Sequence, residues 1–183
     1  MPATQDRKPR RDQVQNRERL LDAARAAFLE DGVDGTPSQR IARLAGVGTT
    51  TLYRHFPRRD ELHRALFERL SRESRVVASR AAEIPDPWES FAFVFEQGCT
   101  LSRRDLGLYD ELARSTPGLD RRAAEHAAEI VGPSVDRAHA AGVLDPQLDV
   151  RDIAELMRLP YAISDPGRRQ RLTAVILAGL RRH

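Results

Sequence analysis

Apolar residues recur at intervals of three and four along most of the chain, the period that places them on one face of an α-helix. The first clear stripe is Leu20, Leu21, Ala24 and Phe28, and Gly32 follows it as a helix-ending residue. Strict alternation of apolar and polar residues, the pattern of a half-buried strand, is not found. The chain is therefore predicted to be all-α, with about nine helices.

Two short helices separated by a sharp turn are predicted between residues 37 and 56. Thr36 has the side chain of an N-cap, Pro37 suits the first helical position, and Gln39 completes a capping box. The apolar face of the first helix comprises Ile41, Leu44 and Ala45. Gly46 then ends this helix, because glycine adopts the left-handed conformation without a Cβ penalty.

The second short helix, from about Gly48 to Phe56, has an apolar side and a polar side. Leu52 and Phe56 stand four apart and are expected to point inward, and Pro57 stops the helix. The exposed edge is expected to carry Thr49, Thr50, Tyr53 and Arg54. Helices joined in this way form a helix-turn-helix, whose second helix reads base edges in the major groove of DNA. An ordinary pair of packed helices is the alternative.

The threonines expected to read bases are followed by side chains that can hydrogen-bond to phosphate oxygens. The phenol of Tyr53, the guanidinium of Arg54 and the imidazole of His55 are expected to reach the DNA backbone on either side of the groove. Arg58 and Arg59 open the next helix, where they and its first amides form a further phosphate site. A solvated helix start is the alternative for these two arginines, and a surface histidine is the alternative for His55.

Residues 17–70 resemble the tetracycline-repressor-like (TetR) family of bacterial transcriptional regulators. The resemblance begins at ERLLDAARAAFLEDG, the family's first helix, and is strongest over TLYRHF, residues 51–56. It implies a DNA-binding repressor that a small molecule, lodged among helices four to eight, releases from its operator. The residues that it implies in DNA contact are Ser38, Gln39, Thr49, Thr50, Tyr53, Arg54, His55 and Arg59.

Three residues depart from the family pattern. Gly48, which we include among the predicted DNA contacts, stands where a serine often caps the recognition helix. Thr50 replaces a usually smaller residue, and Arg58 replaces a capping serine. These changes leave the fold prediction intact and leave the operator sequence open.

The remainder of the chain is predicted to form a second, helical domain. We expect three domain parts: a disordered basic arm at 1–15, the DNA-binding domain at 16–60, and a ligand-binding and dimerisation domain at 61–183. The helices expected after residue 57 cover 58–83, 88–102, 105–114 and 119–141, the last with a kink or break at Gly132-Pro133, then two more separated by Asp165-Pro166-Gly167.

The last helix is apolar around more than half of its circumference, which favours a homodimer through the last two helices. A dimer places two recognition helices about one DNA turn apart, so an approximately palindromic operator is expected. The alternative is a helix buried within its own subunit.

Charge separates the two ends of the chain. Residues 1–60 hold 12 Arg or Lys against 8 Asp or Glu, a balance of +4, whereas residues 61–183 hold 18 against 19, a balance of −1. The basic arm at 1–15 can lie along phosphates, with a solubilising tail as the alternative. Part of the arginine excess can equally reflect a GC-rich genome.

A ligand site is predicted, less specifically, around an apolar stripe with spacings of three and four. Its candidate residues are Trp88, Phe91, Phe95, Cys99, Tyr109, His126, Met157 and Tyr161, with ordinary core as the alternative.

Catalysis is not expected, because no metal-ligand spacing, activated nucleophile or glycine-rich phosphate loop is found, and no cofactor or metal is predicted. The single cysteine excludes an internal disulfide. With no apparent signal peptide or membrane-length apolar run, a cytoplasmic protein is expected. An architectural DNA-binding protein without an effector is the other reading.

Overall fold

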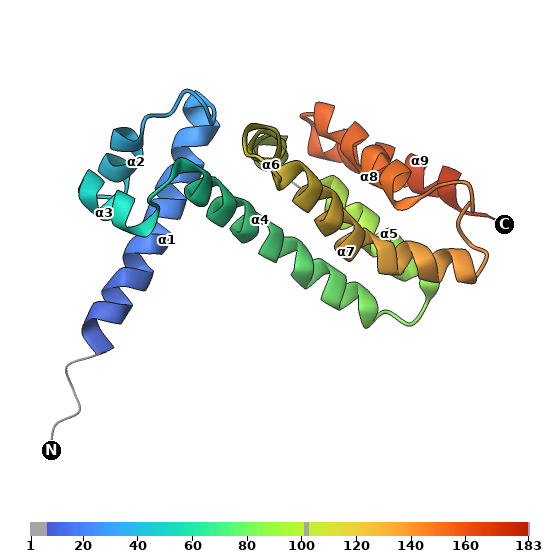
Figure 1. Ribbon diagram of the computed structural model, residues 1–183. Helices are drawn as coiled ribbons and strands as arrows, with labels where there is room; N and C mark the ends of the chain where they lie inside the picture. The colour runs from blue at the N-terminus through green and yellow to red at the C-terminus, as the bar shows by residue number, and fades with distance from the viewer. Residues whose placement is uncertain (1–6, 101–102, 183) are drawn as a thin grey trace, which may run out of the picture. The chain divides into compact units, whose positions relative to one another are not determined.

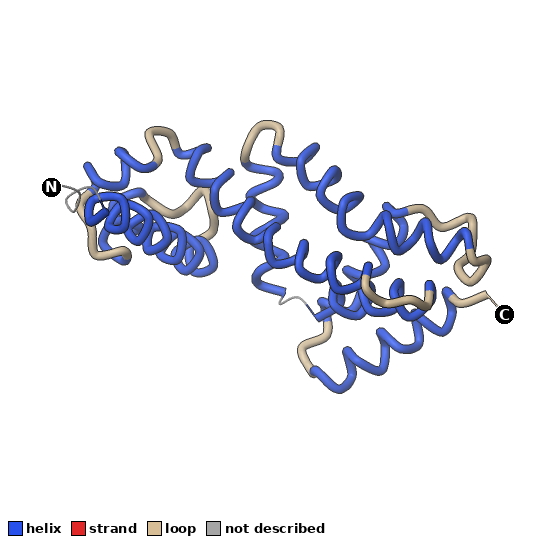
Figure 2. The backbone as a smooth tube through the Cα atoms, turned by 90° about the horizontal axis from the view of Figure 1, so that it is seen from below, coloured by secondary structure: helices blue, strands red, loops and turns tan. Residues whose placement is uncertain are grey.

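The computed structural model describes residues 7–100 and 103–182, and in this part of the chain it consists of helices and loops with one isolated bridge between Leu144 and Arg181 (Figures 1 and 2). The helices are α1 Arg7–Asp31, α2 Ser38–Leu44, α3 Thr49–His55, α4 Arg59–Ala82, α5 Pro87–Thr100, α6 Arg103–Ser115, α7 Leu119–Ala140, α8 Val150–Arg158, the 3-10 turn η1 Leu159–Ala162, and α9 Pro166–Leu180. The all-α prediction is confirmed. None of the described helices combines the length and apolar character that a membrane span requires.

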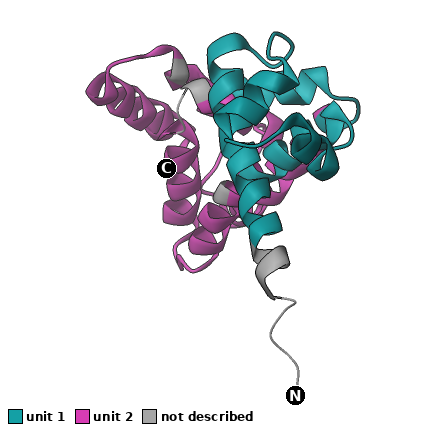
Figure 3. Cartoon of the chain, turned by 90° about the vertical axis from the view of Figure 1, so that its left-hand side faces the viewer, with its two compact units in different colours: residues 1–69, 107–119 teal, residues 70–106, 120–183 magenta. Residues whose placement is uncertain are grey.

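The chain divides into two compact units (Figure 3). The first contains residues 1–69 and 107–119, and the second contains residues 70–106 and 120–183. The sequence placed a boundary after residue 60, whereas the structure places it within α4 and gives most of α6 to the first unit.

Contacts across a long sequence separation explain why the end of α6 belongs to the first unit. The Val33 N–H donates to Glu111 Oε1 at 2.7 Å, and His63 Nδ1 lies 2.9 Å from Thr116 Oγ1. The ring of Tyr109 stacks on Phe67 with centroids 4.4 Å apart. No local sequence pattern marks these contacts, since each joins residues more than 40 positions apart.

Helix α1 begins earlier than the sequence predicted. It starts at Arg7, so residues 7–15 are helical where a disordered arm was expected, and residues 1–6 lie outside the described part. Arginine and glutamine, which dominate this stretch, are good helix formers, and Pro9 falls in the first turn, where its missing N–H costs no hydrogen bond.

The core of the first unit gathers the apolar faces of its helices. Its largest fully buried side chains are Leu20, Ile41, Leu52, Phe56, Leu66, Phe67 and Leu112. Gly46 has a φ of +65°, as the predicted turn requires, and a Cβ there would lie 2.7 Å from Arg19 Nη2. Leu44 was expected in this core but is 50% exposed, and Ala42 is buried instead.

The predicted cap of α2 by Thr36 is wrong. The N-cap position is Pro37, and no side chain caps the helix. The Thr36 hydroxyl instead donates to the carbonyl oxygen of Gly32 at 2.8 Å. Thr36 is buried, so its hydroxyl bonds the end of α1, which is the closest available acceptor.

The second unit is built around the apolar side of α5. Trp88, Phe91, Phe95 and Cys99 are buried in a core to which α7, α8 and α9 also contribute. Helix α7 is uninterrupted from Leu119 to Ala140 although it contains Pro133, so it does not form two pieces.

Candidate nucleic-acid interface and apolar cavity

Helix α3 exposes a polar edge over a buried apolar side. Leu52 is buried, and Phe56, the C-cap, is 1% exposed. On the other side Tyr53 is 50% exposed, and the three threonines 49–51 are exposed or half-buried. This is the arrangement that the spacing predicted, with hydroxyl groups available on the surface.

The start of α3 is open, as the glycine at its cap predicts. Gly48 is the N-cap with extended backbone angles, and no side chain bonds the first-turn amides. Nothing lies within 4 Å of the position that a Cβ at Gly48 would occupy. A serine could therefore be accommodated here, and the glycine is not required by packing.

His55 is held at the end of α3 as an uncharged ring. Burial lowers its pKa, and the positive charges of Arg54 and Arg17 lower it further. Arg17 also donates to the His55 carbonyl oxygen at 3.5 Å and lies over the Phe56 ring, 4.5 Å from its centroid. In the chain without DNA, the charged form of this imidazole is therefore disfavoured.

Arg59 points into the first unit rather than outward. Its Nη2 donates to the Val33 carbonyl oxygen, and its guanidinium carbon is 5.8 Å from the centre of the Phe28 ring. Arg58 is exposed and pairs with Glu61 at 3.0 Å. In this structure one N–H of Arg59 secures the turn between α1 and α2, and its remaining guanidinium donors are the groups that could bond a phosphate.

The two α2 candidates differ in exposure. Gln39 is exposed and Ser38 is half-buried.

Between α2 and α1, Arg40 forms ion pairs with Glu30 and with Asp31, the latter at 2.5 Å. These pairs join α2 to the end of α1, a contact that the sequence pattern did not reveal.

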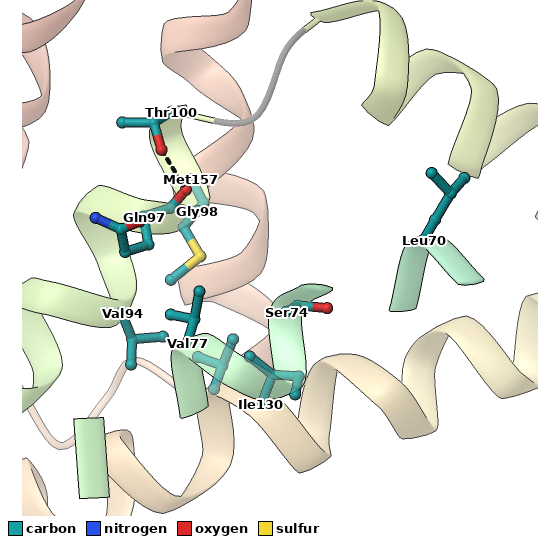
Figure 4. A pocket seen from close by; sticks show the side chains of 10 residues that line it. Leu70, Ser74, Val77, Val94, Gln97, Gly98, Thr100, Ile130 and Met157 are labelled. Atoms are coloured by element: carbon teal, nitrogen blue, oxygen red, sulfur yellow. Dashed lines mark hydrogen bonds between the residues drawn. The ribbon is translucent and has the colours of Figure 1, made fainter. Parts of the chain in front are cut away.

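The second unit contains an apolar cavity of about 320 Å³ between α4, α5, α7 and α8 (Figure 4). Its lining residues are Leu70, Ser74, Val77, Val94, Gln97, Gly98, Thr100, Ile130, Val131 and Met157. Of the residues predicted to bind a ligand, only Met157 lines this cavity.

The predicted aromatic stripe forms core rather than the wall of this cavity. The Trp88 and Phe91 rings are 5.5 Å apart, and the Phe91 and Phe95 rings 6.0 Å. Burial raises the pKa of the Cys99 thiol to about 11, so this cysteine is not an activated nucleophile. The cavity uses the adjacent face of α5, which carries positions 94, 97 and 98.

The other candidates are dispersed. Tyr109 packs on Phe67 in the first unit, and the side chain of Tyr161 lies outside the described residues. His126 does not line the cavity, but its Nε2 is 2.7 Å from the Ser74 hydroxyl, which does.

His126 connects this hydroxyl to a surface cluster of charges. Its Nδ1 is 3.6 Å from Glu129 Oε2, and Glu129 pairs with Arg122 at 3.3 Å and Arg75 at 3.8 Å. Burial is the main cause that lowers the pKa of His126, and Arg75 adds to it. Within the described residues, no group of three or more His, Cys, Asp or Glu side chains is arranged to hold a metal ion.

Comparison with known proteins identifies the family to which the chain belongs. The family model described as bacterial regulatory proteins, tetR family, matches residues 20–66, from α1 into α4. The HTH-type transcriptional repressor KstR of Rhodococcus jostii is 30% identical over 135 residues, 73% of this chain and 62% of KstR. The first curated relatives are covered over 42% to 62% of their own lengths.

Solved structures extend the similarity to both units. The TetR transcription regulatory protein from Mycobacterium vanbaalenii is 29% identical, with a TM-score of 0.62 over 94% of this chain and 99% of that one. AibR, solved with isovaleryl coenzyme A and operator DNA, shares the fold with a TM-score of 0.74 at 16% identity, over 90% of this chain and 97% of AibR. The protein is thus a two-unit helical protein with a helix-turn-helix. It belongs to the TetR family of bacterial regulatory proteins.

Proposed function

We propose that the protein is a homodimeric transcriptional repressor that binds a palindromic operator and is released from it by a small molecule. The observation that carries this proposal is the exposed polar edge of α3 on a helix-turn-helix of the TetR family. Membership in a family of regulatory proteins favours this role over catalysis. Because the proposed target is DNA, the cytoplasm is the proposed location.

Base reading is assigned to the start of α3. The hydroxyl groups of Thr49 and Thr50 accept or donate to base edges, and their methyl groups can contact thymine. Tyr53, Arg54 and His55 bond the flanking phosphates, together with Ser38 and Gln39 on α2 and the guanidinium of Arg59. Gly48 leaves the first amides of α3 accessible. Contacts of residues 1–15 with DNA remain a prediction.

Dimerisation is assigned to α8 and α9. In the second unit Val175 on α9 is 66% exposed and Leu159, next to α8, is 61% exposed, while Leu177 is buried in the subunit's own core. Exposed apolar residues beside a satisfied core favour a partner of the same kind. We expect the full chain to have a dimeric mass in solution at micromolar concentration without DNA.

A charge placed at this surface tests the assignment. Val175→Asp is expected to give a monomer, measured by light scattering, since a buried carboxylate without a partner is costly. Val76→Asp is the matched control, because Val76 is also exposed (53%) but lies on α4. A wild-type monomer, or an equal effect of both variants, would remove α8 and α9 as the interface.

The cavity of the second unit is the proposed effector site. AibR was solved with both an acyl-coenzyme A and its operator, which supports a ligand-responsive role for the shared fold. A ligand changes DNA affinity only if it binds the free and DNA-bound states with different affinity.

Selection of bound duplexes from a random pool, followed by a screen for molecules that release them, tests the whole proposal. A palindromic sequence and its release by a ligand are expected. Binding without sequence preference would instead identify an architectural DNA-binding protein, and an absence of DNA binding would reject the proposal.

A further inference from the structure

We propose that the cavity of the second unit binds an uncharged, mainly hydrocarbon molecule bearing a hydroxyl group, and that this hydroxyl donates a hydrogen bond to Ser74. The inference rests on the proposed function in one respect, namely that the cavity holds the effector. It goes further by assigning the chemical class of the ligand and one contact that recognises it.

The walls of the cavity disfavour a charged group placed among them. Six of its ten lining residues are aliphatic or methionine, and none is Asp, Glu, Lys, Arg or His. Figure 4 shows Val77, Val94, Ile130 and Met157 gathered on one side of it. A carboxylate or ammonium group placed among these side chains loses its hydration and gains no opposite charge, which weakens binding.

The charged residues near the cavity do not offset this loss of hydration. His126, the titratable group nearest to Ser74, has a lowered pKa and is uncharged at neutral pH, so it offers no cation to an anionic ligand. Arg75 and Arg122 are paired with Glu129, and none of these three residues lines the cavity.

The polar contact at Ser74 has a defined direction. Its hydroxyl oxygen lies 3.0 Å from the Ser71 carbonyl oxygen and 2.7 Å from His126 Nε2. The single hydroxyl proton is used on one of these two neighbours, whichever tautomer His126 adopts. At least one lone pair of the Ser74 oxygen is then left for a ligand, so the group that it recognises is a donor.

A second hydroxyl group of the lining, that of Thr100, already has a hydrogen-bond acceptor. Thr100 donates to the Gln97 carbonyl oxygen at 2.8 Å, the bond drawn in Figure 4. Beside it, a Cβ on Gly98 would lie 2.8 Å from Met157 Sδ. The absence of a side chain at position 98 allows the Met157 thioether to lie against α5, where it bounds the cavity with a flexible apolar group.

The volume fits a single small molecule. About 320 Å³ lies at the lower end of the range of roughly 300–1,000 Å³ typical of small-molecule sites. The ligand is therefore a medium-sized alcohol of hydrocarbon character, rather than a nucleotide or another polyanion.

Calorimetric titration of the full chain with four probes of matched length tests this assignment. The probes are n-decanol, its isomer nonyl methyl ether, decanoate and decylammonium. The alcohol and the ether have the same composition and length, but only the alcohol carries a hydrogen-bond donor, so their ratio of affinities reports what this donor contributes. We expect the alcohol to bind about 3- to 10-fold more tightly than the ether, the usual effect of one hydrogen bond. Both charged probes are expected to bind at least about tenfold more weakly than the alcohol.

Two variants locate the contact. Ser74→Ala should abolish the preference for the alcohol over the ether, whereas Ser79→Ala should preserve it. Ser79 is the matched control, because it lies on the same helix and its hydroxyl donates to the Arg75 carbonyl oxygen, but it is exposed and outside the cavity. Val77→Phe, which fills the cavity, should weaken binding of all four probes.

Equal affinities of the alcohol and the ether, tighter binding of a charged probe, or no binding of any probe would overturn the inference. Binding of the selected palindrome by the same preparations is measured in parallel without probes. Loss of the probe results with operator binding intact rejects the ligand class alone, and failure to bind any palindrome rejects the proposed function. The operator assay also shows that each variant is folded.

Discussion

The two units place their functional groups in opposite ways. The first unit carries them outward, on a helix of seven residues whose apolar side is buried beneath them. The second unit lines a partly open cavity with side chains from four helices. A surface edge depends on a few residues that are close in the sequence, whereas a cavity depends on how distant segments pack. Substitutions should therefore affect the two sites by different routes.

The largest effects are expected from truncating a buried aromatic in either unit. Phe56→Ala and Phe91→Ala each empty a position that is at most 1% exposed, and each should lower the free energy of unfolding by about 3–5 kcal/mol. Phe56→Ala should also abolish operator binding, since Phe56 closes α3. Denaturant unfolding measures the loss of stability, and operator titration measures DNA binding. Phe91→Ala molecules that remain folded should still bind the operator.

Acid sensitivity should distinguish the buried histidines of the two units. Burial lowers the pKa of His63 from 6.5 to about 4, so the unfolded chain takes up a proton that the folded chain does not. Stability conferred by neutral His63 is complete above the unfolded pKa and is lost as the pH falls from 6.5 towards 4. The loss by about pH 4.5 should be roughly 2–3 kcal/mol.

The variant His63→Asn should remove this part of the acid sensitivity, measured by urea unfolding at neutral and acidic pH. His126→Asn should remove less, because Glu129 opposes the lowering of the His126 pKa by burial. The reverse order would show that His63 is not held neutral in the folded first unit.

The contact of α6 with the first unit should have an intermediate effect. Glu111→Ala leaves the buried Val33 N–H without its acceptor, at a cost of about 1–3 kcal/mol in unfolding free energy. Glu111→Gln keeps an acceptor oxygen and should recover much of this loss. Glu125→Ala, which removes the surface ion pairs of Glu125 with Arg121 and Arg122 in the second unit, should cost about 0–1 kcal/mol. Equal effects of the two alanine variants would contradict the role of Glu111.

The smallest effect is expected at a single hydroxyl of the recognition helix. Tyr53→Phe should weaken operator binding by about 3- to 10-fold without changing stability, because it removes one hydrogen bond to phosphate. Tyr109→Phe is the matched control in the same unit, away from α3, and should leave operator affinity unchanged. Fluorescence anisotropy with a labelled duplex measures both.

The difference between the sites also explains what the sequence could predict. The positions of α2 and α3, the turn at Gly46 and the inward Leu52 follow from local spacing and were predicted correctly. The pairing of Glu111 with Val33 could not be predicted, because 78 positions separate the two residues. Thr36 failed as a cap for a related reason, since it bonds the end of α1 instead.

Most of the residues that line the cavity were not predicted, because an empty space between helices produces no pattern in the sequence. Trp88, Phe91 and Phe95 have the spacing expected of either core or a ligand site, and the structure buries them as core. The lining that the sequence did not suggest, including Ser74 and Gln97, becomes recognisable only when α4 and α5 are seen together.

The central claim, that the exposed edge of α3 reads base pairs, is tested most directly by comparing the duplexes that wild type and Thr49→Ala select from one random pool. We expect a palindrome with half-sites about one helical turn (~34 Å) apart, changed by Thr49→Ala at the same position in both half-sites. An identical palindrome selected by both proteins would show that Thr49 does not read bases, and selection of no palindrome would show that the protein is not a dimeric operator-binding regulator.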